Sequence, residues 1–253
     1  FTYSTNGSVV TITGYTGSDS EVVIPDTIDG LPVVNLGDSA FARCAVLAAV
    51  TIPNTVTSIG PCAFNSCTSL TAIEVGALNP AYASLAGVLF DKSQTTLIQC
   101  PAGKTGSYAI PESVTNVGDW AFEYCSRLTS VTIPNGVTSI GMLTFGGCAS
   151  FTAVTIPDTV TGLGDWAFGG CTSLTGVFFM GNCPTLSTLP DAMPFYGSSP
   201  TVYYLPGATG WGTTFGDRPT ALWLPRVESN DGDFGVRTNQ FGFNVTWAAA
   251  RSS

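Results

Sequence analysis

The sequence contains no histidine and few charged residues, and both shortages narrow the functions open to it. Without histidine, nucleophilic catalysis of the serine–histidine type is excluded. The 8 Lys and Arg are outnumbered by 17 Asp and Glu, so little positive charge is present to neutralise a phosphate backbone. We therefore expect neither a catalytic triad nor a nucleic-acid partner.

Long apolar runs are missing as well, although 44% of the residues are hydrophobic. No run approaches the roughly 20 residues that a membrane-spanning helix needs, so no membrane insertion is expected. Charged residues make up only 10% of the chain, a balance that favours a durable extracellular protein over a cytosolic enzyme. The sequence starts at Phe1 without a leader, and we expect any signal peptide to have been removed.

An internal repeat of 23 residues dominates what is present. The segment VTIPNGVTSIGMLTFGGCASFTA (131–153) is followed directly by VTIPDTVTGLGDWAFGGCTSLTG (154–176). Related copies begin at Val22, Val50 and Tyr108. Such a period is typical of a solenoid, whose coils fold only by covering one another's apolar faces. Function is therefore expected on an extended repeated surface rather than in one catalytic cleft.

Each copy is expected to form the same short elements. Val131 and Ile133 alternate with a threonine, which predicts a short strand with one buried face, and a proline then ends the strand. A glycine further along is expected to take positive φ at a sharp turn. The glycines of this column are Gly37, Gly60, Gly118, Gly141 and Gly164. The Ala-Phe-x-x-Cys segment that follows predicts a short helical or 3-10 turn.

The repeat also predicts how the chain is divided. The expected parts are a capping hairpin (1–21), a solenoid (22–225) with an insert (73–107) and degenerate coils (177–225), and a polar linker with an orphan β-strand (226–253). The hairpin is predicted from two alternating segments around Asn6-Gly7, a turn-forming dipeptide. Within the insert, residues 87–103 predict two strands around a polar turn.

The repeat resembles the BspA-like (Treponema pallidum-type) leucine-rich repeats of bacterial surface and secreted proteins. The shared elements are strand-Pro, Val-Thr-x-Ile-Gly, Ala-Phe-x-x-Cys and Leu-Thr, and they cover about residues 22–225. The resemblance implies a right-handed leucine-rich-repeat superhelix, mainly β with short helical or 3-10 turns, with 23-residue coils and a parallel strand face. It further implies a secreted or cell-surface bacterial protein with a non-catalytic role and no cofactor.

Five cysteines share one column of the repeat: Cys44, Cys67, Cys125, Cys148 and Cys171. Coils stacked at strand spacing place such neighbours about 4.8 Å apart, which allows either disulfides or a structural ladder of buried thiols. The small, apolar character of cysteine favours the buried thiols. Cys62, Cys100 and Cys183 stand outside this column and stay open as disulfide partners. No metal site is predicted, because histidine and C-x2-C pairs are absent.

Two columns are candidate interaction surfaces. Thr51, Thr132 and Thr155 are expected to be exposed on the strand face, where sheet stabilisation is the alternative role. Trp120 and Trp166 are expected on the outer side of the segment that contains Ala-Phe-x-x-Cys, where aromatic rings favour binding. The alternative for these two is that each ring lies flat over its own coil.

The sequence thus predicts a non-catalytic scaffold that contacts protein, either itself or another, or glycan. Self-assembly of identical copies into an extracellular fibre or layer is slightly favoured, because open sheet edges recruit strands and the C-terminal segment forms an unpartnered strand. This candidate assembly strand alternates Phe241, Phe243, Val245 and Trp247. The alternative is an adhesin or recognition module for a protein or glycan of a host or neighbouring cell.

Overall fold

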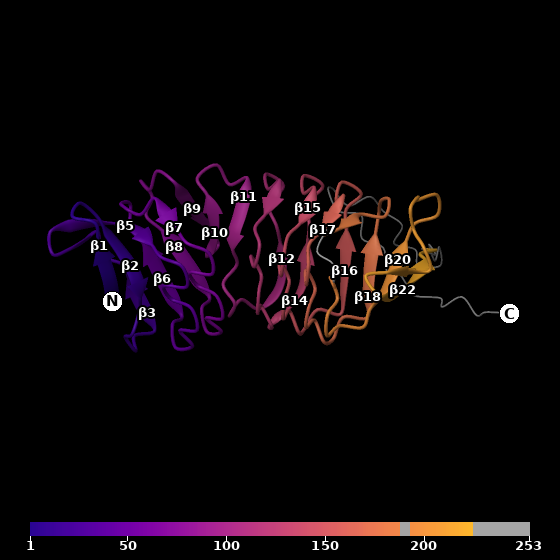
Figure 1. Cartoon of the computed structure of the whole chain (residues 1–253), viewed down its shortest axis with the longest axis horizontal. Coiled ribbons are helices and arrows are strands. Elements are labelled where there is room, and N and C mark those ends of the chain that lie inside the picture. The colour runs from indigo at the N-terminus through magenta and orange to yellow at the C-terminus, as the bar shows by residue number, and fades with distance from the viewer. Residues whose placement is uncertain (188–192, 225–253) are drawn as a thin grey trace, which may run out of the picture.

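In the computed structural model, residues 1–187 and 193–224 are described, and they form an elongated β-solenoid (Figure 1). Successive coils follow one another along the long axis, starting from the N-terminus at one end. The described residues contain 22 strands and no helix. Consequently, they include no helix long and apolar enough to cross a membrane. The predicted repeat solenoid of 23-residue coils with parallel strands is confirmed.

The first strand of each coil, the Val-Thr-Ile segment, lies in a stack that we call the strand face. Neighbouring strands are parallel and shifted by one repeat, as in the pairs Val50–Ile73 and Val154–Val177. Side chains alternate between the buried and outer sides of each strand. The strands of this face are β3 (Glu21–Val23), β6 (Ala49–Ile52), β8 (Ala72–Val75), β12 (Gly106–Ala109), β14 (Leu128–Thr132), β16 (Ala153–Ile156), β18 (Gly176–Phe179), β20 (Thr201–Tyr204) and β22 (Arg218–Leu222).

A second side of the solenoid is built from another row of strands, most of which are two residues long. They pair in parallel, coil to coil, as in Val117–Ile140 and Ile140–Leu163. The strands are β5 (Leu31–Leu36), β7 (Ser58–Ile59), β13 (Asn116–Val117), β15 (Ser139–Ile140), β17 (Gly162–Leu163) and β19 (Thr185–Leu186). The insert joins this side through three further strands, β9 (Tyr82–Leu85), β10 (Val88–Asp91) and β11 (Thr96–Gln99). The expected antiparallel pair in residues 87–103 is β10 and β11, and β11 then pairs in parallel with β13.

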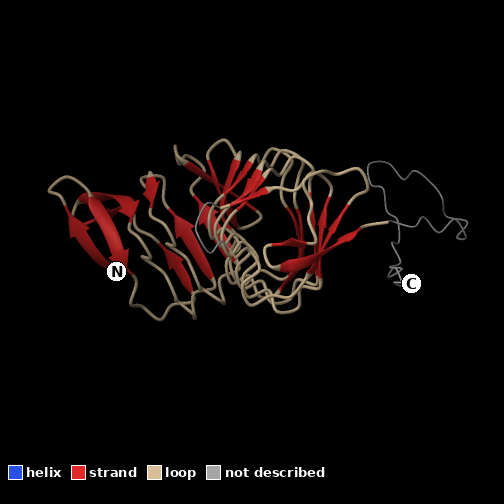
Figure 2. Cartoon of the chain, turned by 45° about the vertical axis from the view of Figure 1, so that its right-hand side comes forward, coloured by secondary structure: helices blue, strands red, loops and turns tan. Residues whose placement is uncertain are grey.

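The third side consists of stacked turns, which we call the turn face (Figure 2). Here the expected helical or 3-10 turns are absent from the described residues, because backbone N–H groups donate alternately within the segment and to the neighbouring coil. Glu123 N donates to Trp120 O within the segment. Phe122 N, by contrast, donates to Thr144 O of the neighbouring coil at 2.8 Å. Positive φ values of 58° at both Trp120 and Tyr124 also break any helical path. The Ala-Phe-x-x-Cys segment thus behaves as a third ladder between coils.

The expected positive φ of the glycine column is wrong. None of Gly37, Gly60, Gly118, Gly141 and Gly164 has a positive φ. Close approach between coils explains the most crowded of these glycines instead. A Cβ on Gly164 would lie 2.4 Å from the carbonyl carbon of Gly141, and one on Gly141 would lie 2.1 Å from an oxygen of Asp119. A side chain at Gly164 would therefore push neighbouring coils apart, because it meets backbone atoms, whereas one at Gly141 would displace the Asp119 side chain.

The core is an apolar interior in which phenylalanine rings stack from coil to coil. Stacked pairs are Phe41–Phe64, Phe122–Phe145, Phe145–Phe168 and Phe168–Phe195, with ring centroids 5.1–5.9 Å apart. The insert divides this interior into two clusters of buried residues. Along β10, Leu89 packs in the N-terminal cluster, whereas Val88 and Phe90 pack in the C-terminal one.

Short antiparallel pairs flank the coils. β1 (Thr2–Thr5) and β2 (Val10–Gly14) form the hairpin expected around Asn6-Gly7, and β2 then pairs in parallel with β5. Two further short strands, β4 (Thr27–Ile28) and β21 (Thr214–Phe215), pair with β5 and β22. The division of the chain into three parts stays a prediction. The candidate assembly strand (Phe241, Phe243, Val245 and Trp247) lies outside the described residues.

Candidate functional site

The three threonines of the strand face share a column but do not form a continuous array. Thr132 and Thr155 are exposed, and Thr51 is half-buried. In the register of the sheet, Glu74 follows Thr51 and Phe178 follows Thr155. Of the three, only Thr132 and Thr155 lie in neighbouring coils. The strand face therefore does not present a continuous row of threonine hydroxyl groups.

Trp120 and Trp166 share a column of the turn face but lie in different hollows. Trp120 is half-buried and lines a cleft beside the insert. Trp166 is 40% exposed and stacks on Tyr196, with ring centroids 4.8 Å apart and planes inclined by 9°. Leu143 occupies the same column in the coil between the two tryptophans. The two rings therefore belong to separate sites rather than to one stripe.

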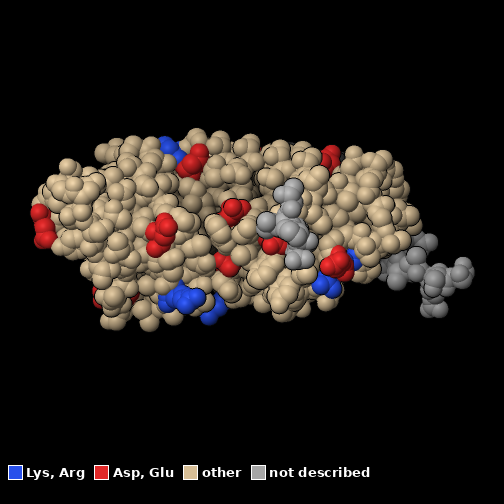
Figure 3. All heavy atoms as spheres, viewed as in Figure 1, with Lys and Arg blue, Asp and Glu red and all other residues tan. Residues whose placement is uncertain are grey.

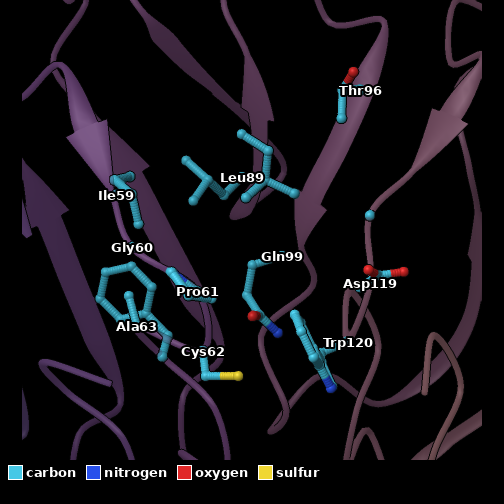
Figure 4. A pocket seen from close by; sticks show the side chains of 13 residues that line it. Ile59, Gly60, Pro61, Cys62, Ala63, Leu89, Thr96, Gln99, Asp119 and Trp120 are labelled. Atoms are coloured by element: carbon cyan, nitrogen blue, oxygen red, sulfur yellow. The ribbon is translucent and has the colours of Figure 1, made fainter. Parts of the chain in front are cut away.

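The cleft beside Trp120 lies where the insert crosses the turn side only through the short, largely buried segment between β11 and β12, residues 100–105. The turns at 61–64 and 118–120 are left facing each other across a hollow of about 190 Å³ (Figure 4). Figure 4 shows the side chain of Gln99 between those of Cys62 and Trp120. Burial raises the pKa of the Cys62 thiol, so the reactive thiolate is disfavoured near neutral pH.

One hydrogen bond spans the gap left by the insert. Asn65 Nδ2 donates to Glu123 Oε2 at 2.6 Å, and so joins turn segments that lie 58 residues apart. Burial raises the pKa of Glu123, and the bond from Asn65 opposes this by lowering it. The bond also orients the Glu123 carboxyl group, which lies at the border between this cleft and the next hollow.

The second hollow, which we call the glycine slot, has a volume of about 230 Å³. Glycine pairs from two successive coils form its floor, and aromatic residues of the coils before and after stand at its ends. The lining residues are Glu123, Tyr124, Leu143, Gly146, Gly147, Trp166, Gly169, Gly170 and Tyr196. Of these, Tyr124 and Tyr196 are 45% and 54% exposed. The slot is thus an aromatic-walled hollow open to solvent.

Sequence reasoning identified Trp166 but missed the rest of the slot. The sequence feature that corresponds to the slot is a Gly-Gly pair, repeated at 146–147 and 169–170. The coil before these pairs carries Tyr124, and the coil after them carries Tyr196. Tyr196 was hidden because the repeat period decays beyond Gly176. A hollow formed by missing side chains is visible only once neighbouring coils are placed side by side.

The cysteine column supplies hydrogen-bond donors between coils. Cys67, Cys148 and Cys171 are buried, and the sulfur of each lies 2.9–3.3 Å from the carbonyl oxygen of the phenylalanine one coil earlier. Ser198 takes this place in the next coil and donates to Phe168 O at 2.7 Å. Burial raises the pKa of Cys171 to about 12. All eight cysteines lie among the described residues and are free.

The other two members of the column fit less regularly. The Cys125 sulfur lies 3.8 Å from the Cys100 carbonyl oxygen, because the insert replaces the preceding phenylalanine. Cys44 is half-buried, and its sulfur lies 3.9 Å from Tyr15 O. Most members of the column thus place a thiol near a carbonyl oxygen of the preceding coil, and the Ser198 hydroxyl makes the same kind of contact.

Comparison with known proteins places the repeat in a family. The family described as BspA type leucine rich repeat region matches residues 34–108 and 102–192, in six copies. A leucine-rich repeat protein of solved structure from Eubacterium ventriosum is similar at 25% identity and a TM-score of 0.59, over 75% of this chain and 61% of that one. No curated protein matches the chain.

A second solved structure shares the fold. The pneumococcal vaccine antigen PcpA is similar at 20% identity and a TM-score of 0.53, over 73% of this chain and 56% of that one. The chain therefore spans less than two thirds of the length of either protein. At these identities, the similarity establishes the shared solenoid fold. It does not indicate that the three proteins bind the same partners.

Proposed function

Because the chain belongs to the BspA-type leucine-rich repeat family, we propose that it is an extracellular, non-catalytic recognition module that binds its partner through the turn face. The leucine-rich repeat fold is generally a scaffold for interactions between proteins. The observation that carries the proposal is the cluster of exposed aromatic rings of Tyr124, Trp166 and Tyr196 around one hollow. Aromatic side chains of this kind are enriched in binding sites.

Charge and composition support the same proposal. Few acidic and basic side chains appear on the face drawn in Figure 3, and they are scattered. On this face we therefore expect affinity to come from contacts within local hollows rather than from clusters of charged side chains. The low share of charged residues, 10%, also suits an extracellular location. Secretion, like the partner, is part of the proposal.

We expect Trp166→Leu to weaken binding of the purified protein to immobilised extracellular proteins and glycoproteins about tenfold or more, because it removes an exposed anchor ring. Leucine already occupies this column at Leu143, with a φ of 50°, so the backbone tolerates the change. The measurement is surface plasmon resonance against a panel of such partners.

The matched control is Leu78→Ala, which removes an 82% exposed side chain outside the turn segments and should leave binding unchanged. A double variant, Thr132→Lys with Thr155→Lys, tests the strand face. If that variant abolishes binding and Trp166→Leu does not, the turn face is the wrong surface. A panel that the native protein does not bind at all also contradicts a recognition role.

Self-assembly is the second candidate function, and the described residues support it at the N-terminal end. β1 is the outer strand of its sheet, and all four of its residues are exposed. It contains neither proline nor a charged residue, two of the devices that protect sheet edges. An unprotected edge of this kind pairs readily with a strand of a second copy.

Ser4→Lys is therefore expected to abolish concentration-dependent assembly, because lysine on an edge strand opposes pairing. Sedimentation velocity over a range of protein concentrations measures the effect. Ser8→Lys adds the same charge at the exposed hairpin turn and should assemble like the native chain. Assembly is ruled out at β1 if the native protein stays monomeric at every concentration, or if Ser4→Lys assembles normally.

A further inference from the structure

We infer that the glycine slot binds one sugar ring of a neutral glycan, an inference that rests on the proposed recognition function of the turn face. Its first support is that the backbone does not require glycine at these places. Gly147 and Gly170 have φ values of 71° and 68°, but Arg43, Ser66 and Tyr124 hold φ values of 58–62° at the same position of their coils. Side chains are thus tolerated in this column.

The neighbouring column gives the same result. The residue before each of these positions is Gly146 or Gly169 in the slot, but Asn65, Glu123 and Tyr196 in other coils. A Cβ on Gly170 would meet nothing closer than 3.7 Å, whereas Cβ atoms on Gly146 and Gly147 would lie 2.7 and 2.8 Å from side-chain carbons of Leu143 and Tyr124, which would have to move aside. The hollow therefore comes from side chains that the fold accommodates elsewhere and that are missing in two successive coils.

The size and closure of the slot favour a single ring over an extended chain segment. Two coils at strand spacing give a floor of about 10 Å, and the coils that carry Tyr124 and Tyr196 lie beyond its two ends. The floor offers no free edge to a peptide strand. Gly147 N donates to Gly169 O, and Gly170 N to Tyr196 O, each at 2.7 Å. Peptide recognition by strand addition is therefore disfavoured here.

The lining matches the two sides of a sugar ring. A pyranose has an apolar face of C–H groups, which packs on aromatic rings, and an edge of hydroxyl groups, which needs hydrogen-bond partners. Trp166, stacked on Tyr196, supplies aromatic surface. Glu123 supplies a carboxylate that Asn65 holds through Oε2, so that Oε1 is the remaining acceptor. The phenol groups of the two tyrosines both donate and accept.

Charge decides between neutral and acidic sugars. The slot lining contains one carboxyl group, that of Glu123, and neither lysine nor arginine. An anionic ring placed there finds no compensating cation among the lining residues, which costs binding free energy. The ligand class is therefore a neutral oligosaccharide whose chain continues out of the open side of the slot.

The test is isothermal titration calorimetry of the full-length chain with neutral tetrasaccharides of glucose, mannose, galactose and N-acetylglucosamine. At least one should bind, and Trp166→Leu should weaken it about tenfold or more. Gly170→Tyr is expected to abolish binding by filling the slot without removing any ring. Its matched control is Arg43→Tyr, which changes an exposed residue with a φ of 62° at the same position of an N-terminal coil, outside the slot lining.

Both tyrosine variants are expected to fold, because Tyr124 already occupies the same column. Circular dichroism melts check this. The inference is overturned if no neutral tetrasaccharide binds, if Gly170→Tyr binds as well as Arg43→Tyr, or if polygalacturonate or decaproline binds the slot instead. Failure of this inference is distinct from failure of the proposed function. In the first case, Trp166→Leu still weakens binding to the protein panel, whereas in the second the turn-face variants change nothing on that panel.

Discussion

Replacing Phe145 with alanine is expected to lower the free energy of unfolding by about 3–5 kcal/mol. The side chain is 1% exposed, and its ring stacks on Phe122 and Phe168 at centroid distances of 5.1 and 5.2 Å. Truncation removes both contacts and leaves a cavity between three coils. Because each coil is stabilised mainly by its neighbours, one substitution weakens two interfaces at once. Urea denaturation followed by circular dichroism measures the loss.

The comparison variant for this experiment is again Leu78→Ala, which removes an aliphatic side chain that is 82% exposed. It should change the unfolding free energy by no more than about 0.5 kcal/mol. A Phe145→Ala protein with native stability would mean that the ring stack contributes little, and the account of the core would then have to be abandoned.

Gly164→Ala is expected to cost about 3 kcal/mol, although it adds a single methyl group. The added Cβ would lie 2.4 Å from the Gly141 carbonyl carbon and 2.6 Å from Met142 N. Both are backbone atoms, which cannot rotate aside as a side chain does, so the two coils must separate locally. Thermal and urea unfolding of the variant give the free-energy change.

Gly162, two residues earlier, provides a matched control. A Cβ there would meet only the Ser139 Cβ, at an ordinary 3.7 Å, and its φ is not positive. Gly162→Ala should therefore be neutral or stabilise the protein by about 0.4–1 kcal/mol through the unfolded chain. Equal effects of the two substitutions would show that glycine at 164 serves some purpose other than close approach of the coils.

The sequence predicted the solenoid because the coils at 131–153 and 154–176 follow each other directly and carry the same residue at 13 of 23 positions. It did not predict the conformation of the turn segments. An Ala-Phe-x-x-Cys segment is compatible with a helical turn by itself, but every second N–H group finds its partner in another coil, as Phe122 N does in Thr144 O. The same limit explains the wrong expectation of positive φ for the glycine column, since close approach involves residues 23 positions apart.

The candidate site was predictable only in part. The tryptophan column followed from the alignment of coils, so Trp166 was singled out. Its stacking partner Tyr196 lies where the period has decayed, and the floor of the glycine slot consists of residues without side chains. A pattern-based search looks for residues that carry chemistry. A hollow between coils is formed by absent side chains, and no residue pattern marks it directly.

The insert has a consequence for how the molecule responds to strain. It separates two apolar interiors, crosses the turn side only through the short segment 100–105, and leaves the Asn65–Glu123 hydrogen bond spanning the opening. The rod is therefore jointed at one place: N-terminal and C-terminal halves can loosen independently, in the manner of two cooperative units in series. Tension applied along the long axis would concentrate at this joint, and the turns on either side of it would part first.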